Sequence, residues 1–361
     1  MTTDTLEIQM IERLARALPR SPRQLNALHA SDAELVHLTG TTVLAVTTDG
    51  IVEEIATGLY DDAGLVGWMS VLVNASDLAA VGARPLGIVV CETLPPTMGP
   101  EDIAALQRGI ADASLAHGLP VLGGDTNAGS QFQIVGTAVG LVEGAAPLTR
   151  VGAAPGDRLF ASGPLGLGSV FAFTQLSRAA SPLPSSRAPR FRPHARLHEG
   201  AMLRQFASAC MDTSDGLLAT LDEIGRLNGV GFRFTLPVEG MLHGAAHGLA
   251  ETLHLPPWTM LAGPHGEFEL VFTVPAAKAD PFRCAAAAEG WTPIELGEVV
   301  SGSGTTLMPV EGSITLDTGK VRNLFLECGG DADRYVTALV AMHESATAAP
   351  AAPPDRTLGS T

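Results

Sequence analysis

Isolated aspartates recur in short, apolar, glycine-rich stretches of this chain, each where an apolar segment begins or ends. An ionised carboxylate beside buried segments is costly unless a cation neutralises it. No basic residue lies within these stretches, and the whole chain has 22 Lys and Arg against 38 Asp and Glu. Mg²⁺ usually takes one or two carboxylates plus substrate phosphates, so several such loops predict more than one Mg²⁺ around a polyphosphate. The stretches are Thr47-Thr48-Asp49-Gly50, Asn74-Ala75-Ser76-Asp77-Leu78, Gly123-Gly124-Asp125-Thr126 and Met211-Asp212-Thr213-Ser214-Asp215-Gly216-Leu217.

The length, composition and charge of the chain limit the classes of protein to which it can belong. A chain of 361 residues, 46% hydrophobic and 17% charged, is expected to form two globular domains. Its net charge of −16 argues against a nucleic-acid partner or an anionic membrane surface. The four cysteines are far apart without a CxxC pair, which favours reduced thiols in a cytoplasmic protein. We expect no membrane span, because the apolar runs are interrupted before they reach the necessary length.

Periodicity predicts strands and helices in two halves, giving an α/β (α+β) fold. We expect an N-terminal helix within residues 1–27, a first domain over 28–152, a second over 153–335, and a helix end with a disordered tail over 336–361. A low-complexity stretch at 178–194 is predicted to be a mobile insertion, and 345–361 the disordered tail. The Gly-Gly-Asp stretch is interpreted as a turn. The other expected helices are 4–19, 64–82, 101–117, 169–176, 195–208, 215–228 and 278–289, and the strands are 43–48, 86–91, 132–142, 158–161, 231–236, 267–274 and 293–300.

The first three motifs each have a structural alternative. Thr47-Thr48-Asp49-Gly50 could bind metal and phosphate, or simply join a strand to a turn. Asn74 and Asp77, three positions apart, share a helix face, and their apolar neighbours leave little room for a solvent-facing pair. Gly123-Gly124-Asp125 could bring backbone N–H groups to a phosphate, or form an ordinary turn.

The stretch from Met211 to Leu217 is the strongest signal. Ser214 or Asp215 could cap the helix that follows, but a cap explains one polar residue and not both aspartates. The same helix N-terminus also suits a phosphate. The Gly-rich stretch 162–168 lacks the acidic residue and the lysine of known nucleotide loops, so close packing is the alternative role for its glycines. We interpret His117, His194 and His265 as surface groups or as neighbours of ligands.

Together and in order, these motifs resemble the ATP-dependent superfamily of aminoimidazole ribonucleotide synthetase, selenophosphate synthetase, the hydrogenase-maturation dehydratase and thiamine-monophosphate kinase, most closely the last. The resemblance covers about residues 28–325. It implies an N-terminal α/β domain whose strands pair across a homodimer into a β-barrel, followed by a C-terminal α/β domain. Besides the aspartate stretches, it is carried by Ser31-Asp32-Ala33, Val81-Gly82-Ala83 and Glu267-Phe268-Glu269-Leu270.

The resemblance also implies roles for individual residues. Several Mg²⁺ ions would neutralise charge on the transferred phosphoryl group, leaving the protein to supply positioning and electrostatics. Asp77 and Asp215 are the residues on which catalysis would depend, and Glu267 would contact substrate. The implied Mg²⁺ ligands are Asp32, Thr47, Thr48, Asp49, Asp77, Asp125, Asp212 and Asp215, and the implied ATP contacts are Gly124, Arg150 and Ser214.

Three departures from the kinase pattern fall mainly on the acceptor side. The Gly-Asp-Asp near the N-terminus is reduced to Ser31-Asp32, the histidine after the strand aspartate is absent from Val52–Ala56, and Gly-Glu-Asp-Tyr-Glu-Leu becomes His265–Leu270. We therefore expect an ATP- and Mg²⁺-dependent phosphotransferase with a small-molecule acceptor altered from thiamine monophosphate. The alternatives are an ATP-dependent ligase or dehydratase that activates an amide or carboxylate oxygen by phosphorylation, and a non-catalytic nucleotide-binding dimer.

Overall fold

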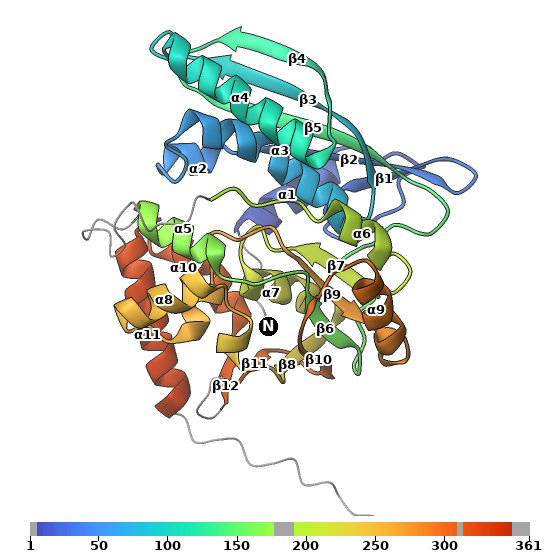
Figure 1. Cartoon of the computed structure of the whole chain (residues 1–361), viewed down its shortest axis with the longest axis vertical. Helices are drawn as coiled ribbons and strands as arrows, with labels where there is room; N and C mark the ends of the chain where they lie inside the picture. The colour runs from blue at the N-terminus through green and yellow to red at the C-terminus, as the bar shows by residue number, and fades with distance from the viewer. Residues whose placement is uncertain (1–5, 177–190, 309–312, 349–361) are drawn as a thin grey trace, which may run out of the picture.

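Two β-sheets, one from each half of the chain, organise the protein into a mixed α/β fold of two domains (Figure 1). The computed structural model describes residues 6–176, 191–308 and 313–348. In Figure 1 the first sheet and its helices lie at the top, and the second sheet lies below them. Helix α1 (Leu6–Ala17) precedes the first sheet, where the sequence predicted it. The expected α/β class is confirmed.

The N-terminal sheet has five strands in the order β1-β2-β5-β3-β4, with only the β3–β4 pair parallel. Burial alternates along β2 and β5, so one face of the sheet lies against helices and the other is open. The predicted strands 43–48, 86–91 and 132–142 are confirmed as β2, β3 and β5. The strands are β1 (Glu34–Thr39), β2 (Thr42–Gly50), β3 (Arg84–Leu94), β4 (Val121–Ala128) and β5 (Gln133–Val142).

Helix α3 (Ala63–Ala80) lies under this sheet and is buried on nearly all sides. Asp62 starts the helix by accepting a hydrogen bond from the Leu65 amide at 2.7 Å. By length and composition alone α3 could cross a membrane, contrary to our expectation that no segment would qualify. However, 72% of the helix is buried inside the fold, as in the core helix of a globular domain.

The remaining helices of this half are α2 (Val52–Ala56) and α4 (Pro100–His117). Helix α4 crosses α3 closely because both carry glycine at the contact. A Cβ on Gly67 would lie 2.1 Å from the Leu106 carbonyl oxygen, and one on Gly109 would lie 2.1 Å from that of Gly64. The left-handed Gly118 ends α4, as the sequence predicted.

The C-terminal sheet has seven strands in the order β12-β11-β8-β10-β6-β9-β7. Its strands are β6 (Arg158–Ala161), β7 (Ala209–Asp212), β8 (Val230–Phe234), β9 (Leu270–Val274), β10 (Ile294–Ser301), β11 (Thr305–Leu307) and β12 (Ile314–Leu316). Its helices are α5 (Leu167–Leu176), α6 (Leu197–Leu203), α7 (Leu217–Asn228), α8 (Gly244–Leu253), α9 (Ala276–Ala288), α10 (Thr318–Glu327) and α11 (Ala332–Ala348), with 3₁₀ turns η1 (Val238–Gly240) and η2 (Pro257–Leu261).

The two domains share apolar packing. Ala79 and Ala80, at the end of α3, lie in a buried cluster with Phe160, Phe272 and other residues of the second domain. In the opposite direction, Phe268 of the second domain is buried within the core of the first. The site described below lies along this shared boundary.

Three local predictions were wrong, each for a physical reason. The Gly-Gly-Asp stretch is not a turn, because β4 runs straight through it and pairs Gly124 with Val90 so closely that a Cβ would lie 1.9 Å from the Val90 oxygen. Strand β9 begins at Leu270 and not at residue 267, because Phe268 has a left-handed backbone with φ 62°. Helix α6 ends at Leu203 and not at 208, which leaves room for the unpredicted β7.

Two predicted mobile segments lie only partly within the described residues. Residues 177–190 of the expected insertion are outside them, but Phe191 is buried and its ring stacks on Phe171 with centroids 4.2 Å apart. The prediction of mobility was therefore wrong for the end of that segment. The tail predicted over 345–361 begins as helix, because α11 continues to Ala348, and residues 349–361 are outside the described part.

We predict that Gly67→Ala destabilises the protein by about 1–3 kcal/mol, because the added methyl overpacks the α3–α4 crossing. Gly248→Ala is the matched control, since a Cβ at this helical glycine in α8 would have no described atom of another element within 4 Å. It should be neutral or stabilising by up to about 1 kcal/mol, because alanine favours helix more than glycine does. Chemical denaturation of both variants measures the difference, and equal stability would contradict the close crossing.

Candidate functional site

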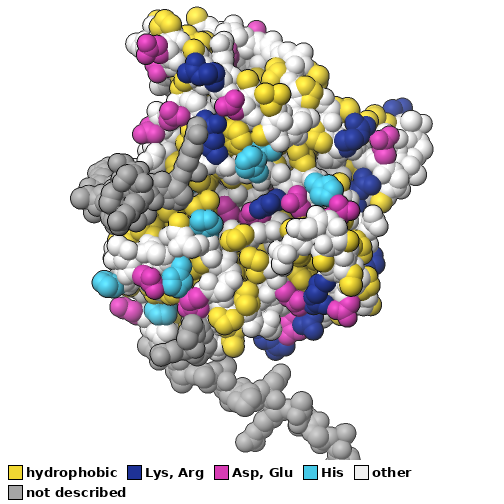
Figure 2. Space-filling model, viewed as in Figure 1, with side chains coloured by type: hydrophobic (Ala, Val, Ile, Leu, Met, Phe, Trp, Pro, Cys, Tyr) yellow, Lys and Arg dark blue, Asp and Glu magenta, His cyan; other side chains and the backbone are white. Residues whose placement is uncertain are grey.

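Three carboxylates from distant parts of the sequence meet in one small space. Oxygen atoms of Asp32, Asp77 and Asp212 all lie within 4.8 Å of one another. Asp32 comes from the loop before β1, Asp77 from the last turn of α3, and Asp212 from the end of β7. Figure 2 shows acidic, basic and histidine side chains gathered between the upper and lower parts of the molecule, along the same boundary.

The contact between α3 and α6 brings the second domain to this cluster. Gly200 of α6 approaches α3 so closely that a Cβ would lie 2.0 Å from the Ala79 oxygen. Just beyond α6, β7 runs to Asp212, whose carboxylate accepts a hydrogen bond of 2.5 Å from the Ser76 hydroxyl. Ser76 is fully buried on α3, so this bond fixes Asp212 against the first domain.

Arg150 provides a positive charge that the local sequence does not show. Its guanidinium donates to Asp32 Oδ1 through Nη2 at 2.9 Å and through Nε at 3.3 Å. No local pattern in the sequence could indicate this pair, because 118 residues separate the two partners. The other oxygen, Asp32 Oδ2, is buried and has no hydrogen-bond partner among the described residues.

The surroundings of Asp77 disfavour its ionised form. Burial raises its pKa well above the ordinary value, and the nearby charges of Asp49, Asp212 and Asp32 raise it further. The Thr47 hydroxyl donates a short hydrogen bond to Asp77. Burial and Asp32 likewise raise the pKa of Asp212 to about 7, against the opposing Ser76 hydrogen bond and the charge of Arg150. The described residues thus bring three carboxyl groups together with one bonded arginine, which disfavours their ionised forms in the absence of a further cation.

Asp215 lies beside this cluster and is not used as a helix cap. The prediction that Ser214 or Asp215 caps α7 was wrong, because the cap position is Gly216, with φ 87° and no side-chain cap hydrogen bond. The Asp215 side chain reaches solvent, yet the surrounding protein removes enough water to raise its pKa. Arg322 and Arg150 oppose this rise, and Asp49 adds to it. Asp215 is therefore an available carboxylate at the start of a helix.

Other predicted site residues are not brought to the cluster. Thr48 points to the opposite face of β2 from Thr47, and its hydroxyl bonds the Gly136 carbonyl at 3.0 Å. Gly124 and Asp125 lie on exposed β4, which β5 and β3 separate from β2. At about 4.8 Å per strand, this places Asp125 roughly 14 Å from Asp49.

Glu267, the predicted substrate contact, is buried and bonded to the protein. Its Oε2 accepts hydrogen bonds from the amides of Gly166 at 2.8 Å and Gly168 at 3.3 Å. A Cβ on Gly168 would lie 2.3 Å from the Gly266 backbone, so this glycine loop serves close packing, the alternative that its sequence left open. Burial raises the Glu267 pKa to about 7 despite these bonds.

Two histidines are more deeply placed than the sequence indicated. His117 and His265 are both buried, so the surface interpretation was wrong for them, whereas His194 is exposed. The His265 ring forms a hydrogen bond with the Tyr60 hydroxyl, and burial lowers its pKa to about 4, so it is neutral. The sequence could not predict that Tyr60 and His265 are hydrogen-bonded, because the two residues are 205 positions apart.

Sequence reasoning also missed Glu54 and Ser76. Burial raises the pKa of Glu54, and the charges of Asp215 and Asp49 raise it further, so all three carboxylates face one region. Ser76 stood inside a motif that had been singled out, directly before Asp77. Its position next to Asp77, a predicted metal ligand, is the feature of the sequence that could have indicated its role.

Comparison with known proteins identifies relatives of this chain. Residues 30–142 match the family described as AIR synthase related protein, N-terminal domain. The thiamine-monophosphate kinase of Caulobacter vibrioides is 30% identical over 304 residues, which cover 83% of this chain and 86% of that protein. The thiamine-monophosphate kinase of Methanospirillum hungatei is 34% identical over 59% of this chain and 68% of that protein. The chain belongs to the thiamine-monophosphate kinase family.

The fold agrees with this membership. The solved structure of AaThiL complexed with AMPPCP and TMP matches with a TM-score of 0.68, covering 86% of this chain and 98% of that one at 23% identity. The family resemblance predicted from the aspartate motifs is therefore confirmed, and this member is an ATP-dependent kinase by descent. The cluster of Asp32, Asp77 and Asp212 offers only oxygen atoms as ligands. Hard divalent cations such as Mg²⁺ prefer oxygen ligands.

We predict that Asp212→Asn flattens the pH dependence of stability in the metal-free protein. A carboxyl whose pKa rises from 3.8 to about 7 on folding gives stability that is complete below pH 3.8 and lost as the pH rises through 7. In EDTA, the melting temperature of the variant should therefore gain on that of the wild type between pH 4 and pH 8. Asp280→Asn, at an exposed position on α9, is the control and should follow the wild type. Parallel curves for Asp212→Asn and the wild type would contradict the raised pKa.

Proposed function

We propose that this chain transfers the γ-phosphoryl group of ATP, with Mg²⁺, to a small-molecule acceptor related to but altered from thiamine monophosphate. The observation that carries the proposal is the buried group of Asp32, Asp77 and Asp212, whose charge exceeds that of the one arginine bonded to it. The ionised form of such a group is costly without a cation, which is why the pKa values of Asp77 and Asp212 are raised and why a divalent cation would bind there. Membership of a kinase family supplies the reaction class.

The residues present fit Mg²⁺. Asp32 Oδ2 is a buried acceptor without a hydrogen-bond partner among the described residues, which is the environment expected of an atom that ligates a metal. We assign Asp32, Asp77 and Asp212 to one ion, and Asp49 and Asp215, at the edge of the cluster, to further ions shared with phosphate. Thr47 would orient Asp77 through its hydrogen bond. When bound, the metal would neutralise charge on the phosphoryl group.

The start of α7 would receive the nucleotide phosphates. Its first amides have no partners within the helix, and the helix dipole favours negative charge there. Ser214 and Asp215 directly precede Gly216, so phosphate oxygens at this end would lie beside the carboxylates. Arg150 would hold Asp32 in place and lend its charge to ATP. AaThiL, which has this fold, is known with the ATP analogue AMPPCP, which supports the assignment.

The acceptor side supports a changed specificity. The family relatives act on thiamine monophosphate by name, but here Val52–Ala56 carries no histidine and folds as α2. In the altered stretch 265–270, Glu267 bonds backbone amides, and Glu269 bonds Arg196 and Ser162. These bonds to the protein use most of the accepting capacity of both carboxylates, which supports a changed contact to the acceptor. A site that loses its polar contacts to one substrate discriminates poorly in favour of it.

The assay that tests this function follows ATP consumption with thiamine monophosphate and a panel of small acceptors, with phosphorus NMR of the products. We predict Mg²⁺-dependent formation of a stable phosphorylated product, with kcat/KM for thiamine monophosphate below about 10⁴ M⁻¹s⁻¹. A higher value would contradict the altered acceptor. Inorganic phosphate without a phosphorylated product would contradict phosphoryl transfer and favour the ligase or dehydratase alternative.

Site variants in the same assay connect the activity to the cluster. Asp77→Asn and Asp215→Asn should each lower kcat about 10²-fold or more while leaving the fold intact, because each replaces a charged ligand with a neutral group of similar shape. Asp102→Asn, an exposed aspartate in the first turn of α4, is the matched control. Unchanged kcat in both site variants would show that these aspartates are structural.

We also infer that the N-terminal domain, residues 28–152, forms a homodimer, with residues 153–335 as the second domain. Leu86, Val89, Val121 and Leu122 of its sheet are exposed, and β4 is an edge strand that pairs only with β3 among the described strands. Such edges need a partner or protection, and pairing across the dimer would close the sheets into a barrel. Dimerisation is also the route by which Gly124 and Asp125 would take part in ATP and Mg²⁺ binding. A cytoplasmic location agrees with four free cysteine thiols.

We predict a dimeric mass by light scattering at micromolar concentration. Leu122→Glu should shift the protein toward monomer, because it buries a charge in the apolar contact. Leu326→Glu, at another exposed leucine on α10, should leave the mass unchanged. A monomeric wild-type protein would refute the dimer.

A further inference from the structure

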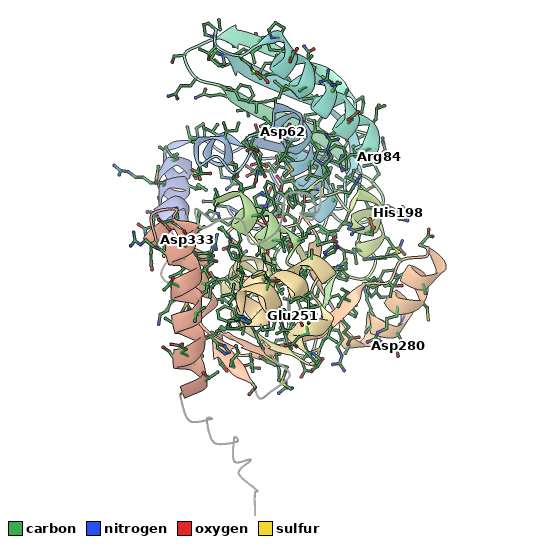
Figure 3. All side chains as sticks on the ribbon, turned by 60° about the vertical axis from the view of Figure 1, so that its left-hand side comes forward. Asp62, Arg84, His198, Glu251, Asp280 and Asp333 are labelled. Atoms are coloured by element: carbon green, nitrogen blue, oxygen red, sulfur yellow. The ribbon has the colours of Figure 1, made fainter. Side chains whose placement is uncertain are left out.

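Helix α11 lies beyond the part of the chain that carries the family motifs, which extends to about residue 325. Figure 3 shows this helix along one side of the second domain, with Asp333 near its beginning. Tyr335 and Leu339, which share a face of the helix, are both buried in the main apolar core of that domain. The helix is therefore an integral part of the second domain.

Tyr335 bonds α11 to the main chain of another segment. Its hydroxyl donates a hydrogen bond of 3.0 Å to the carbonyl of Ala262, directly after η2. The ring packs against Phe325 and Phe173, with centroids 5.4 and 6.3 Å away. Burial raises the pKa of the Tyr335 hydroxyl above its ordinary value, so the group keeps its proton and remains a donor.

His343 makes a second bond from α11 to the same region. Trp258 donates a hydrogen bond of 3.1 Å from Nε1 to Nδ1 of His343. Because an indole N–H can only donate, Nδ1 of His343 is the acceptor. Trp258 is buried in η2, the turn that leads into Ala262. Helix α11 therefore holds this region at two points.

The residues that follow η2, which we call the 262–266 loop, pack directly against the start of α7. The Gly266 amide donates a hydrogen bond of 2.8 Å to the Ser214 carbonyl. A Cβ on Gly263 would lie 2.8 Å from the Asp215 carbonyl oxygen. Backbone thus touches backbone, and close-packed interiors transmit a displacement from one segment to the next. A shift of the 262–266 loop would move the start of α7.

Helix α5 also holds the 262–266 loop. The Ser169 hydroxyl lies 2.8 Å from the Met260 carbonyl oxygen and 3.1 Å from that of Gly263. Ser169 is buried, so this contact is shielded from water. Because the loop has this further attachment, we expect the loss of one bond from α11 to loosen the loop without unfolding the domain.

We propose that α11 positions the start of α7, with Tyr335 and His343 as positioning residues for the nucleotide. The inference rests on the proposed function, because the start of α7 is the end to which we assign the phosphates of ATP. Backbone amides that are already held in place bind an anion more tightly, since less ordering opposes binding. Each of the two residues acts through the 262–266 loop and not by contact with the ligand.

Hydrogen exchange of the full chain, without nucleotide or metal, tests the positioning by itself. Tyr335→Phe removes the hydroxyl and keeps the ring. We expect the amides of residues 213–220 to exchange about three-fold faster or more, because the lost hydrogen bond lowers the cost of local opening. A role in overall stability alone would instead raise exchange throughout the domain.

Phe282→Leu is the matched control for a loss of core packing. Phe282 belongs to a buried cluster that contains neither Tyr335 nor Leu339. Its helix α9, marked by Asp280 in Figure 3, lies on the opposite side of the second domain from Asp333 of α11. This variant should leave the exchange of residues 213–220 unchanged relative to the rest of the domain.

Two substitutions of His343 separate its hydrogen bond from its packing. His343→Ala should speed exchange at residues 213–220 as Tyr335→Phe does. His343→Asn should restore the wild-type rate, because the asparagine Oδ1 can accept from Trp258 in place of Nδ1. Unchanged exchange at 213–220 in both Tyr335→Phe and His343→Ala, or an equal rise throughout the domain, would overturn the proposal.

Calorimetric titration with ATP and Mg²⁺ then connects the positioning to nucleotide binding. Tyr335→Phe should weaken the affinity about three-fold or more, and Phe282→Leu should bind as the wild type does. Unchanged affinity in Tyr335→Phe would overturn its role toward the nucleotide. A wild-type protein that binds no ATP would contradict the proposed function, and the exchange measurements would still decide whether α11 positions α7.

Discussion

The crowding of carboxylates at the boundary between the two domains is the constraint on which the rest of the structure depends. Asp32, Asp77 and Asp212 approach within 4.8 Å, where their mutual repulsion and lost hydration oppose folding. The fold opposes this cost with Arg150 on one carboxylate and with hydroxyl donors from Thr47 and Ser76 on the other two. Tight apolar packing of α3 against α6 holds the groups together in spite of their charge.

The sequence predicted the elements whose pattern is local. The apolar, almost uninterrupted α3 and the alternating β2 and β5 follow from residue spacing alone, and their predicted positions agree with the structure. The aspartate motifs identified the family because their order along the chain is itself informative, and the comparisons confirm it. The assignment of individual site residues remains a set of proposals, although three of the predicted aspartates do lie together.

What the sequence could not predict depends on partners that are distant along the chain. Arg150 and Asp32 are 118 residues apart in the sequence, and Tyr60 and His265 are 205 residues apart. No local sequence pattern could therefore predict either pair. The roles of the glycines were also hard to predict, because glycine occurs both in turns and where two backbone segments pack closely. Gly124 allows β4 to approach β3, while Gly216 takes the left-handed cap position of α7 that had been given to Ser214 or Asp215.

The directions of two helices have a consequence for how a nucleotide would be oriented. Helix α3 ends at the cluster, with Asp77 in its last turn, so the negative end of its macrodipole adds to the carboxylates and strengthens the attraction for metal ions. Helix α7 begins at the same place, directly after Asp215, and presents the positive end of its dipole. The backbone alone therefore sets up an electrostatic gradient across the site. Along it, cations are drawn toward α3 and phosphate oxygens toward α7, before any side chain makes a specific contact.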